Sequence, residues 1–314
     1  MDTSILTDKI MSNPMTFFKQ MRSALLVCLF ANGLWAQQHP SLDNYLFTPV
    51  AISPAHAGMQ NQDVVSLVDA QLVGVPGAPR TGILSADFKT LKGLGFNITA
   101  ITDAVGPMST GQVALSTAYH LPVSENMTLS TGIRATVGRT TVDLSNEVYY
   151  DQLDPSIYTL AGPFIANIDL GTTLNGKNSY FGVSYKNVNR AEIYQSNYTA
   201  QILHVFGGYS KALKNGWTAR TSFLATGTTN SPADLNFHLF MEYDQKWGVG
   251  LHYSPEDEMG MMMKISTAKD WNLYYQYNFP LTDLVYVTRS SHVVGFAFNV
   301  TNKATQLTSP RFFL

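Results

Sequence analysis

Large apolar and small or polar side chains alternate along most of the chain from residue 63 onward. Between Trp271 and Phe279 every second residue is large and apolar or aromatic, and only Tyr274 breaks the pattern. A period of two predicts β-strands with one apolar face and one face of Gly, Ala, Ser, Thr and Asn side chains. A transmembrane barrel has this pattern, because its outer face meets lipid while its inner face is polar.

The alternation defines fourteen segments. They begin near Val64, Thr81, Phe96, Gly111, Met127, Phe164, Tyr180, Ile202, Trp217, Leu235, Gly248, Gly260, Asn272 and His292. Every second connection between them is short and polar, and the connections in between include the long ones. An even strand number and this alternation of turns are expected of a closed bacterial barrel with both termini in the periplasm. We therefore predict an all-β, antiparallel transmembrane barrel over residues 63–302, with 12 or 16 strands as alternatives to 14.

The composition favours a membrane barrel over a soluble β-sandwich. Charged residues make up 13% of the chain, against roughly 25% in soluble domains. A secreted sandwich hides its apolar face and carries charge on the other face, whereas few charges occur here opposite the apolar positions. After residue 36 no stretch approaches the length of an apolar transmembrane helix. The net charge of −2 and the many aromatic residues also exclude a disordered chain and a basic nucleic-acid-binding protein.

Residues 1–36 have the pattern of a secretion signal. Lys19 and Arg22 precede an apolar run that ends at Trp35, as the charged and apolar regions of a signal peptide do. We expect cleavage after Ala36, with Gly33 as the alternative boundary. The alternative interpretation of the segment is an uncleaved membrane anchor. The single cysteine, Cys28, lies in this segment, so we expect no disulfide in the mature chain. The sequence thus predicts export to the outer membrane of a Gram-negative cell.

No set of residues in the sequence predicts catalysis. Ser266 and Lys269 match the S-x-x-K spacing of acyl-serine enzymes, but positions three apart on a strand point to opposite sides of the sheet. The seven histidines include no H-E-x-x-H motif and no i, i+4 pair, which are the spacings of helical metal sites. We expect a protein that is not an enzyme and that has no catalytic, cofactor-binding or metal-binding residues.

Charges of both signs fall on the faces that are predicted to point inward. A pore for one type of ion would more often show a ring of one sign. The mixture favours a plugged or partner-filled barrel, in which opposite charges pair across the lumen. The candidate lumenal charges are Asp87, Lys89, Arg134, Asp169, Lys186, Glu242 and Lys264.

The segment from Asn44 to Gly58 is aromatic and punctuated by prolines, and a Gly-Ala-Pro motif at 77–79 follows the first strand. In these residues the chain resembles the PorP/SprF family of outer-membrane proteins of the type IX secretion and gliding machinery. The resemblance continues through Gly93-Leu94-Gly95 and Ser291-His292 over nearly the whole mature chain. Its candidate motif residues are Tyr45, Phe47, Pro49, Pro54, Ala55, Gly58, Gly77, Ala78 and Pro79.

The chain departs from the pattern of this family at five positions. Thr48 and Ser53 stand where the family has Asn, and His56 stands where it has Tyr. Asp69 and Leu72 replace the usual Arg and Trp. The resemblance therefore implies a divergent paralogue, a type that is often associated with one very large secreted adhesin.

The resemblance implies a component that supports export or surface attachment of a protein substrate. Its partners would be an adhesin-like type IX cargo, other secretion-system subunits and membrane lipid, with no nucleic acid and no cofactor. A passive transporter, or a transporter of hydrophobic substrates, with the same fold is the competing function.

Two terminal segments complete the predicted organisation. We expect residues 37–62 to form a plug-like segment in the periplasmic mouth or the lumen, because Pro and Gly fix a compact path that a regular strand cannot follow. The alternative is a simple turn before the first strand. Residues 303–314 are predicted to form a periplasmic tail.

Tyrosines in the long external loops are the candidate contacts for a protein partner, because they are amphipathic anchors suited to an interface. They are Tyr149, Tyr150, Tyr158, Tyr194 and Tyr198.

Overall fold

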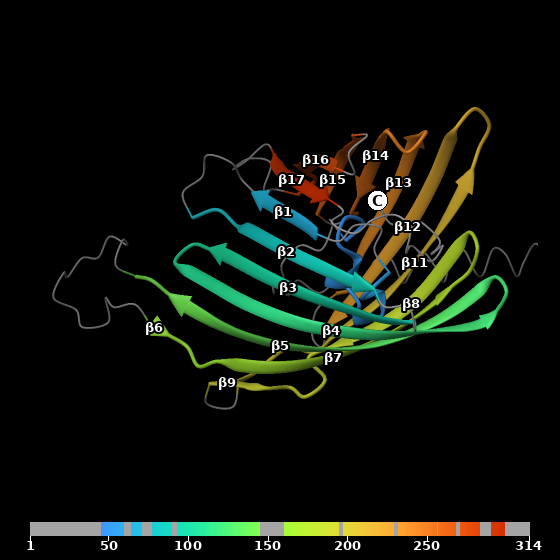
Figure 1. Ribbon diagram of the computed structural model, residues 1–314. Helices are drawn as coiled ribbons and strands as arrows, with labels where there is room; N and C mark the ends of the chain where they lie inside the picture. Colours follow the sequence, from blue (N-terminus) through green and yellow to red (C-terminus); the bar gives the residue numbers. More distant parts are fainter. Residues whose placement is uncertain are drawn as a thin grey trace, which may run out of the picture. The chain divides into compact units, whose positions relative to one another are not determined.

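The chain forms a closed antiparallel β-barrel (Figure 1). The computed structural model describes residues 45–59, 64–70, 77–89, 93–144, 160–194, 197–228, 232–255, 257–267, 271–282 and 290–298. Within these ranges fourteen strands form the ring, because β1 pairs with both β2 and β17, and β4 pairs with both β3 and β5. The predicted transmembrane β-barrel of fourteen strands is confirmed.

The strands of the ring begin within three residues of the predicted positions. They are β1 (Val64–Ala70), β2 (Arg80–Lys89), β3 (Leu94–Val105), β4 (Met108–Ser124), β5 (Met127–Val142), β7 (Ile165–Asn175), β8 (Ser179–Lys186), β11 (Ile202–Ala212), β12 (Trp217–Thr228), β13 (Asp234–Tyr243), β14 (Trp247–Tyr253), β15 (Glu258–Ser266), β16 (Trp271–Pro280) and β17 (Ser291–Phe298). The short elements that the alternation did not predict are the 3-10 helices η1 (Pro49–Ala51) and η2 (Pro54–His56) and the strands β6 (Leu160–Ala161), β9 (Glu192–Tyr194) and β10 (Asn197–Tyr198).

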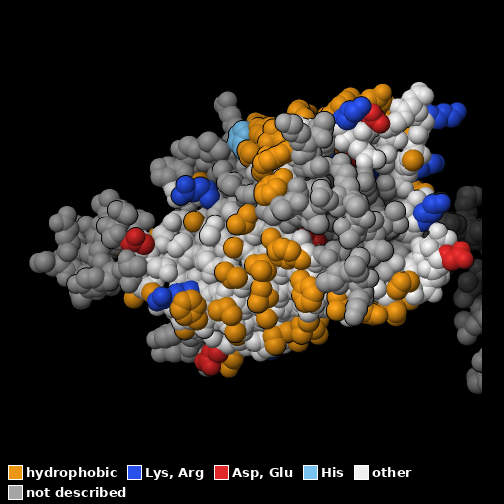
Figure 2. Space-filling model, viewed as in Figure 1, with side chains coloured by type: hydrophobic (Ala, Val, Ile, Leu, Met, Phe, Trp, Pro, Cys, Tyr) orange, Lys and Arg blue, Asp and Glu red, His pale blue; other side chains and the backbone are white. Residues whose placement is uncertain are grey.

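The outer face of the barrel is apolar and the inner face is polar or small. In β4, Leu115 is 58% exposed, while its neighbours Ala114 and Ser116 are each only 4% exposed. On the face shown in Figure 2, hydrophobic side chains gather in the middle, and most of the charged side chains lie toward the left and right ends. This distribution suits a surface that meets lipid along its middle and water at its ends.

Aromatic side chains gather where the strands meet the short turns. Trp217 lies 5.2 Å from Tyr243 and 5.3 Å from Trp247, measured between ring centroids. Trp271 lies 4.6 Å from Phe296 in the same way. Amphipathic rings favour the level of the lipid headgroups, so these clusters mark one interface of the membrane.

The strands differ in length around the ring. Strands β4 and β5 have 17 and 16 residues, whereas β14 has 7. A transmembrane strand needs about 9–11 residues, so β4 and β5 continue beyond the membrane. Figure 1 shows β4 and β5 as long strands in green. Among the residues that the structure describes, no helix is long and apolar enough to cross a membrane.

Candidate functional site: a segment buried inside the barrel

Residues 45–59, here called the plug, lie inside the ring of strands. Every residue from 45 to 58 is buried, and the segment, blue in Figure 1, includes both 3-10 helices. Pro49 and Pro54 each begin one of these helices, where their fixed φ angle is favourable. The side chain of Ser53 accepts a hydrogen bond from the Ala55 amide at 3.3 Å. Ser and Asn are both good N-caps, so Ser53 can replace the usual Asn of the family.

Aromatic side chains connect the plug to three strands of the wall. The ring of Tyr45 packs edge-on against His238 of β13, with centroids 5.1 Å apart. The ring of Phe47 lies 4.4 Å from that of Tyr274 in β16, and His56 lies 5.2 Å from Phe206 in β11. Tyr274, which breaks the sequence alternation, is therefore an inward contact of the plug.

Polar side chains of other strands bind the backbone of the plug. Asp87 of β2 accepts a hydrogen bond from the Gly58 amide at 2.9 Å. His120 of β4 donates from Nε2 to the Ala57 carbonyl at 2.8 Å. Arg134 of β5 donates from Nη1 to the Val50 carbonyl at 2.6 Å. These contacts depend on the path of the plug rather than on its side chains.

Glycines in three strands let the plug approach the wall closely. A Cβ atom at Gly132 of β5 would lie 2.5 Å from the Pro54 carbonyl oxygen. A Cβ atom at Gly95 of β3 would overlap the Ala57 carbonyl, and one at Gly171 of β7 would overlap Ser53 Oγ. The missing side chains therefore form a surface that fits the plug backbone. With the contacts above, the plug touches eight of the fourteen strands of the described ring: β2, β3, β4, β5, β7, β11, β13 and β16.

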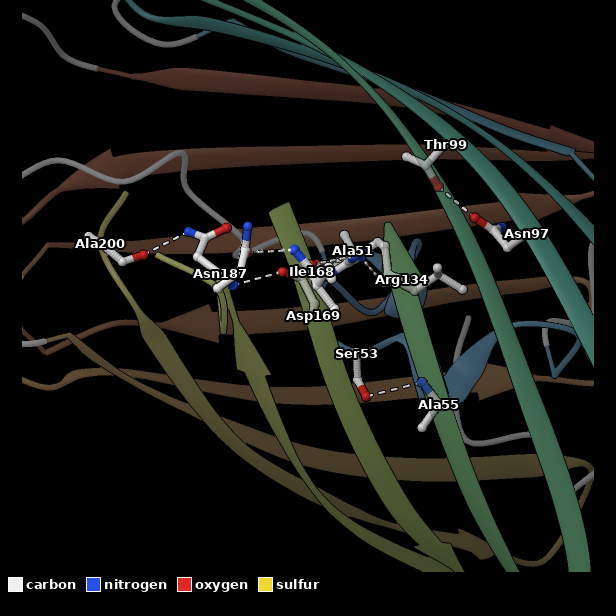
Figure 3. A network of polar contacts seen from close by, with 12 residues as sticks. Ala51, Ser53, Ala55, Asn97, Thr99, Arg134, Ile168, Asp169, Asn187 and Ala200 are labelled. Carbon is white, nitrogen blue, oxygen red and sulfur yellow. Dashed lines mark hydrogen bonds and ion pairs between the residues drawn. The ribbon is translucent and has the colours of Figure 1, made fainter. Parts of the chain in front are cut away.

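Apart from Asp87, which binds the plug, the described candidate lumenal charges form two groups. Arg134 Nε lies 2.6 Å from Asp169 Oδ2 (Figure 3), and both side chains are at most 4% exposed. Lys186, half-buried on the next strand, lies within electrostatic range of both. In the second group, Glu242 pairs with Arg220 at 2.7 Å and with Lys264 at 2.9 Å.

The ion pairs run along the wall, so the expectation that the charges pair across the lumen is wrong. Arg134 and Asp169 are directly opposite each other in the β5–β7 ladder. Glu242 and Lys264 lie on either side of Gly248 in β14, and this glycine leaves the space between them open. Neighbouring strands are about 4.8 Å apart, so Arg134 and Asp169 bridge one strand spacing and Glu242 and Lys264 bridge two. The plug occupies the space between opposite walls.

The other predicted site residues lie elsewhere. Gly77, Ala78 and Pro79 directly precede β2. They lie near the C-terminal end of β3, far from Gly95 at its start. There the Gly77 carbonyl accepts a hydrogen bond from the Gly106 amide at 2.7 Å. Tyr198 in β10 is 49% exposed, and the Arg190 guanidinium lies 5.7 Å from its ring centroid. The structure does not describe the side chains of the remaining predicted residues and segments, which are Lys89, Tyr149, Tyr150, Tyr158, Tyr194, residues 1–36 and residues 303–314.

Several contacts of the plug were not predicted from the sequence, among them His120, Phe206 and Gly132. The contact of Phe206 could have been predicted, because a large aromatic residue on an inward face needs a partner in the lumen. Tyr274 is a second residue of this kind. Arg220 was also missed, although it is buried with Glu242. In the described part of the chain, no three His, Cys, Asp or Glu side chains are placed to bind a metal ion.

A family model described as the type IX secretion system membrane protein PorP/SprF matches residues 34–298. The chain belongs to the PorP/SprF family. This membership confirms the predicted resemblance, and with the barrel architecture it makes the chain an outer-membrane component of the type IX secretion system. None of the curated proteins compared matches the chain.

Two solved structures to which the chain is similar have low sequence identity to it. The toluene transporter TbuX of Ralstonia pickettii is 10% identical, with 82% of this chain and 93% of that chain covered and a TM-score of 0.46. The outer membrane protein Omp33 of Acinetobacter baumannii is 10% identical, with 77% and 99% covered and a TM-score of 0.47.

Acid pH is expected to weaken the binding of the plug through His56. Burial lowers the pKa of this side chain from 6.5 to about 4, although its hydrogen bond to Pro49 opposes part of the shift. When the plug is displaced, His56 is protonated as the pH falls through about 6.5. When the plug is bound, His56 stays neutral until the pH approaches 4. The stabilisation is therefore complete above pH 6.5 and is lost as the pH falls toward 4, by about 3 kcal/mol.

The measurement is thermal unfolding of the purified barrel between pH 7 and pH 4, compared with His56→Gln. The glutamine retains a donor for the Pro49 carbonyl but has no titration in this range. A pH dependence that is equal in both proteins would contradict the assignment to His56.

Proposed function

We propose that this PorP/SprF protein supports the export or the surface attachment of a protein substrate and has no enzymatic activity. The observation that carries the proposal is the buried plug, which touches eight strands of the described ring. A passive transporter requires an open path for its solute, and a plug bound on so many sides obstructs such a path. A barrel that binds a protein partner at its ends does not need a permanently open lumen.

The first test is extraction of the outer membrane in a mild detergent, with an affinity tag on the C-terminal segment, followed by mass spectrometry of the copurifying proteins. We expect a large secreted surface protein or other secretion-system subunits. A heat-modifiable barrel that purifies alone and conducts ions in planar bilayers would instead identify a transporter.

A second test concerns the predicted external contacts. Replacing residues 147–158 with a short Gly-Ser linker removes three of the candidate tyrosines. We expect one surface protein to be released into the medium or retained in the cell, as measured by proteomics of both fractions. The matched control replaces the short turn at 176–178 with a linker. An unchanged surface proteome in the loop variant, with the barrel present at normal abundance, would contradict the proposal.

A further inference from the structure

Three exposed lysines gather at the end of the barrel where short turns join the strands. Lys177 lies in the turn between β7 and β8, Lys214 lies in the turn between β11 and β12, and Lys211 lies near the end of β11. Strands β8 and β11 are neighbours in the ring. Figure 2 shows basic side chains at the right end of the molecule, the end at which β4 turns into β5 in Figure 1. These three lysines are here called the lysine rim.

Two lysines of the rim face each other across neighbouring strands. Beyond the β8–β11 ladder, a hydrogen bond of 2.7 Å joins the Ser210 amide to the Asn178 carbonyl. The register of the two strands therefore places Lys211 opposite Lys177. Opposite residues of antiparallel strands have Cβ atoms about 5 Å apart, and like charges in such a pair repel each other. An anion bound between the two ammonium groups would remove this repulsion.

Among the residues that the structure describes, no ion pair neutralises the lysine rim. The exposed ion pair at the same end of the barrel joins Lys246 Nζ to Asp244 Oδ2 at 2.6 Å, in the turn between β13 and β14. The other described ion pairs lie inside the barrel. The rim thus presents three positive charges that no described carboxylate compensates, whereas Lys246 has a carboxylate partner.

The lysine rim lies at the level of the lipid headgroups. Lys211 shares the outward face of β11 with Tyr209 and Leu213, which are 48% and 43% exposed. On β12 it lies opposite Ala219, which is close to Trp217. The aromatic cluster around Trp217 marks the membrane interface. The apolar stem of Lys211 therefore lies against the membrane surface, and its ammonium group reaches the headgroups.

An apolar surface continues from Lys211 toward the middle of the membrane. On the same face of β11, Gly207 lies between Phe181 of β8 and Phe223 of β12. Phe181 is 53% exposed. A Cβ atom at Gly207 would lie 2.9 Å from Phe223 Cε1, so the phenyl ring covers the glycine. The basic rim is therefore continuous with an aromatic surface suited to an acyl chain.

The short turns of a bacterial barrel face the periplasm, where the outer membrane presents a leaflet of phospholipids. We propose that the lysine rim binds the headgroup of an anionic phospholipid of this leaflet. Its phosphate lies between Lys177 and Lys211, Lys214 contributes a third positive charge, and an acyl chain lies along the aromatic surface beside Gly207. A zwitterionic lipid is disfavoured, because its own ammonium group would approach the three lysines. Such a site is a property of the barrel alone and does not depend on the proposed role in export.

The site is tested by mass spectrometry of the intact purified chain in detergent, in which each bound lipid adds its own mass. The chain is titrated with dioleoyl phosphatidylglycerol, which is anionic, and with dioleoyl phosphatidylcholine, which has the same acyl chains and a zwitterionic headgroup. We expect the anionic lipid to bind more tightly by about fivefold or more, since a single lysine near an anionic surface contributes about this factor. Equal affinity for the two lipids would overturn the proposal.

Lys211→Gln removes one charge of the rim and should lower the affinity for phosphatidylglycerol about fivefold, with the affinity for phosphatidylcholine unchanged. The matched control is Lys246→Gln, which removes one positive charge from the same end of the barrel but not from the rim. Its affinity for phosphatidylglycerol should equal that of the unsubstituted chain. An equal loss in both variants would reveal a diffuse effect of net charge and refute a site at the rim. Heat-modifiability of each variant confirms that the barrel is folded.

The repulsion between Lys177 and Lys211 provides a second readout, the thermal unfolding of the barrel in vesicles. In vesicles of phosphatidylcholine alone, Lys211→Gln removes the repulsion and should unfold at a higher temperature than the unsubstituted chain. In vesicles that also contain phosphatidylglycerol, the order should reverse, because only the unsubstituted chain is stabilised by the bound anionic lipid. The same order in both kinds of vesicle would contradict an anion bound between the two lysines.

Discussion

Gly132→Val is expected to displace the plug and to convert the barrel into a conducting pore. Any Cβ atom at this position would lie 2.5 Å from both the carbonyl carbon and the carbonyl oxygen of Pro54. Overpacking costs about 1–3 kcal/mol, which shifts an equilibrium between bound and displaced plug by roughly 5- to 150-fold. Valine is well suited to a strand, so the wall itself should remain intact. The measurement is single-channel conductance in planar bilayers.

Gly111→Val provides the control for this experiment. Gly111 lies on the neighbouring strand β4, and a Cβ atom there has no other atom within 4 Å. Its conductance and its heat-modifiability should therefore match those of the unsubstituted chain. A Gly132→Val barrel that folds normally and conducts no more than the control would show that the plug does not depend on this close approach.

The second large effect is expected at Glu242, where substitution by Gln should destabilise the barrel by about 3 kcal/mol or more. Its carboxylate is shared by Arg220 and Lys264, and all three side chains are at most 10% exposed. Removing the negative charge leaves two buried positive charges facing the same neutral amide. The midpoint of urea unfolding in detergent micelles, followed by tryptophan fluorescence, measures the change.

The triple variant Arg220→Met, Glu242→Met, Lys264→Met separates charge from packing. Replacing a whole buried ionic group with apolar residues of similar volume is often neutral or stabilising. We therefore expect the triple variant to recover most of the stability that the single variant loses. A triple variant as unstable as Glu242→Gln would assign the effect to lost packing rather than to uncompensated charge.

The barrel was predictable from the sequence because lipid and lumen impose opposite requirements on adjacent residues of every strand. Leu115 and Ser116 in β4 show this directly, since one is exposed to the membrane side and the other is buried. The few exceptions were informative as well: Tyr274 is inward because it packs against Phe47 of the plug.

The binding of the plug was much less predictable. Its polar contacts involve backbone carbonyls such as those of Val50 and Ala57, and every residue has a carbonyl. The glycines that fit the plug are far apart in sequence, and each alone looks like any small residue on an inward face. The expected pairing of charges across the lumen failed for a related reason, since only the register shows that Arg134 and Asp169 are opposite each other on one wall.

The unequal strand lengths imply a hydrophobic mismatch that varies around the circumference of the barrel. At the usual rise and tilt, the 7 residues of β14 extend roughly 18 Å along the membrane normal. This is less than the apolar band of about 25 Å that surrounds typical barrels. Lipid beside β14 must therefore thin locally, whereas lipid beside β4 meets a wall taller than the bilayer. The cost of such thinning is a fraction of a kcal/mol per Å. The protein should therefore prefer thin or deformable regions of its membrane, with the thinnest lipid beside its short strands.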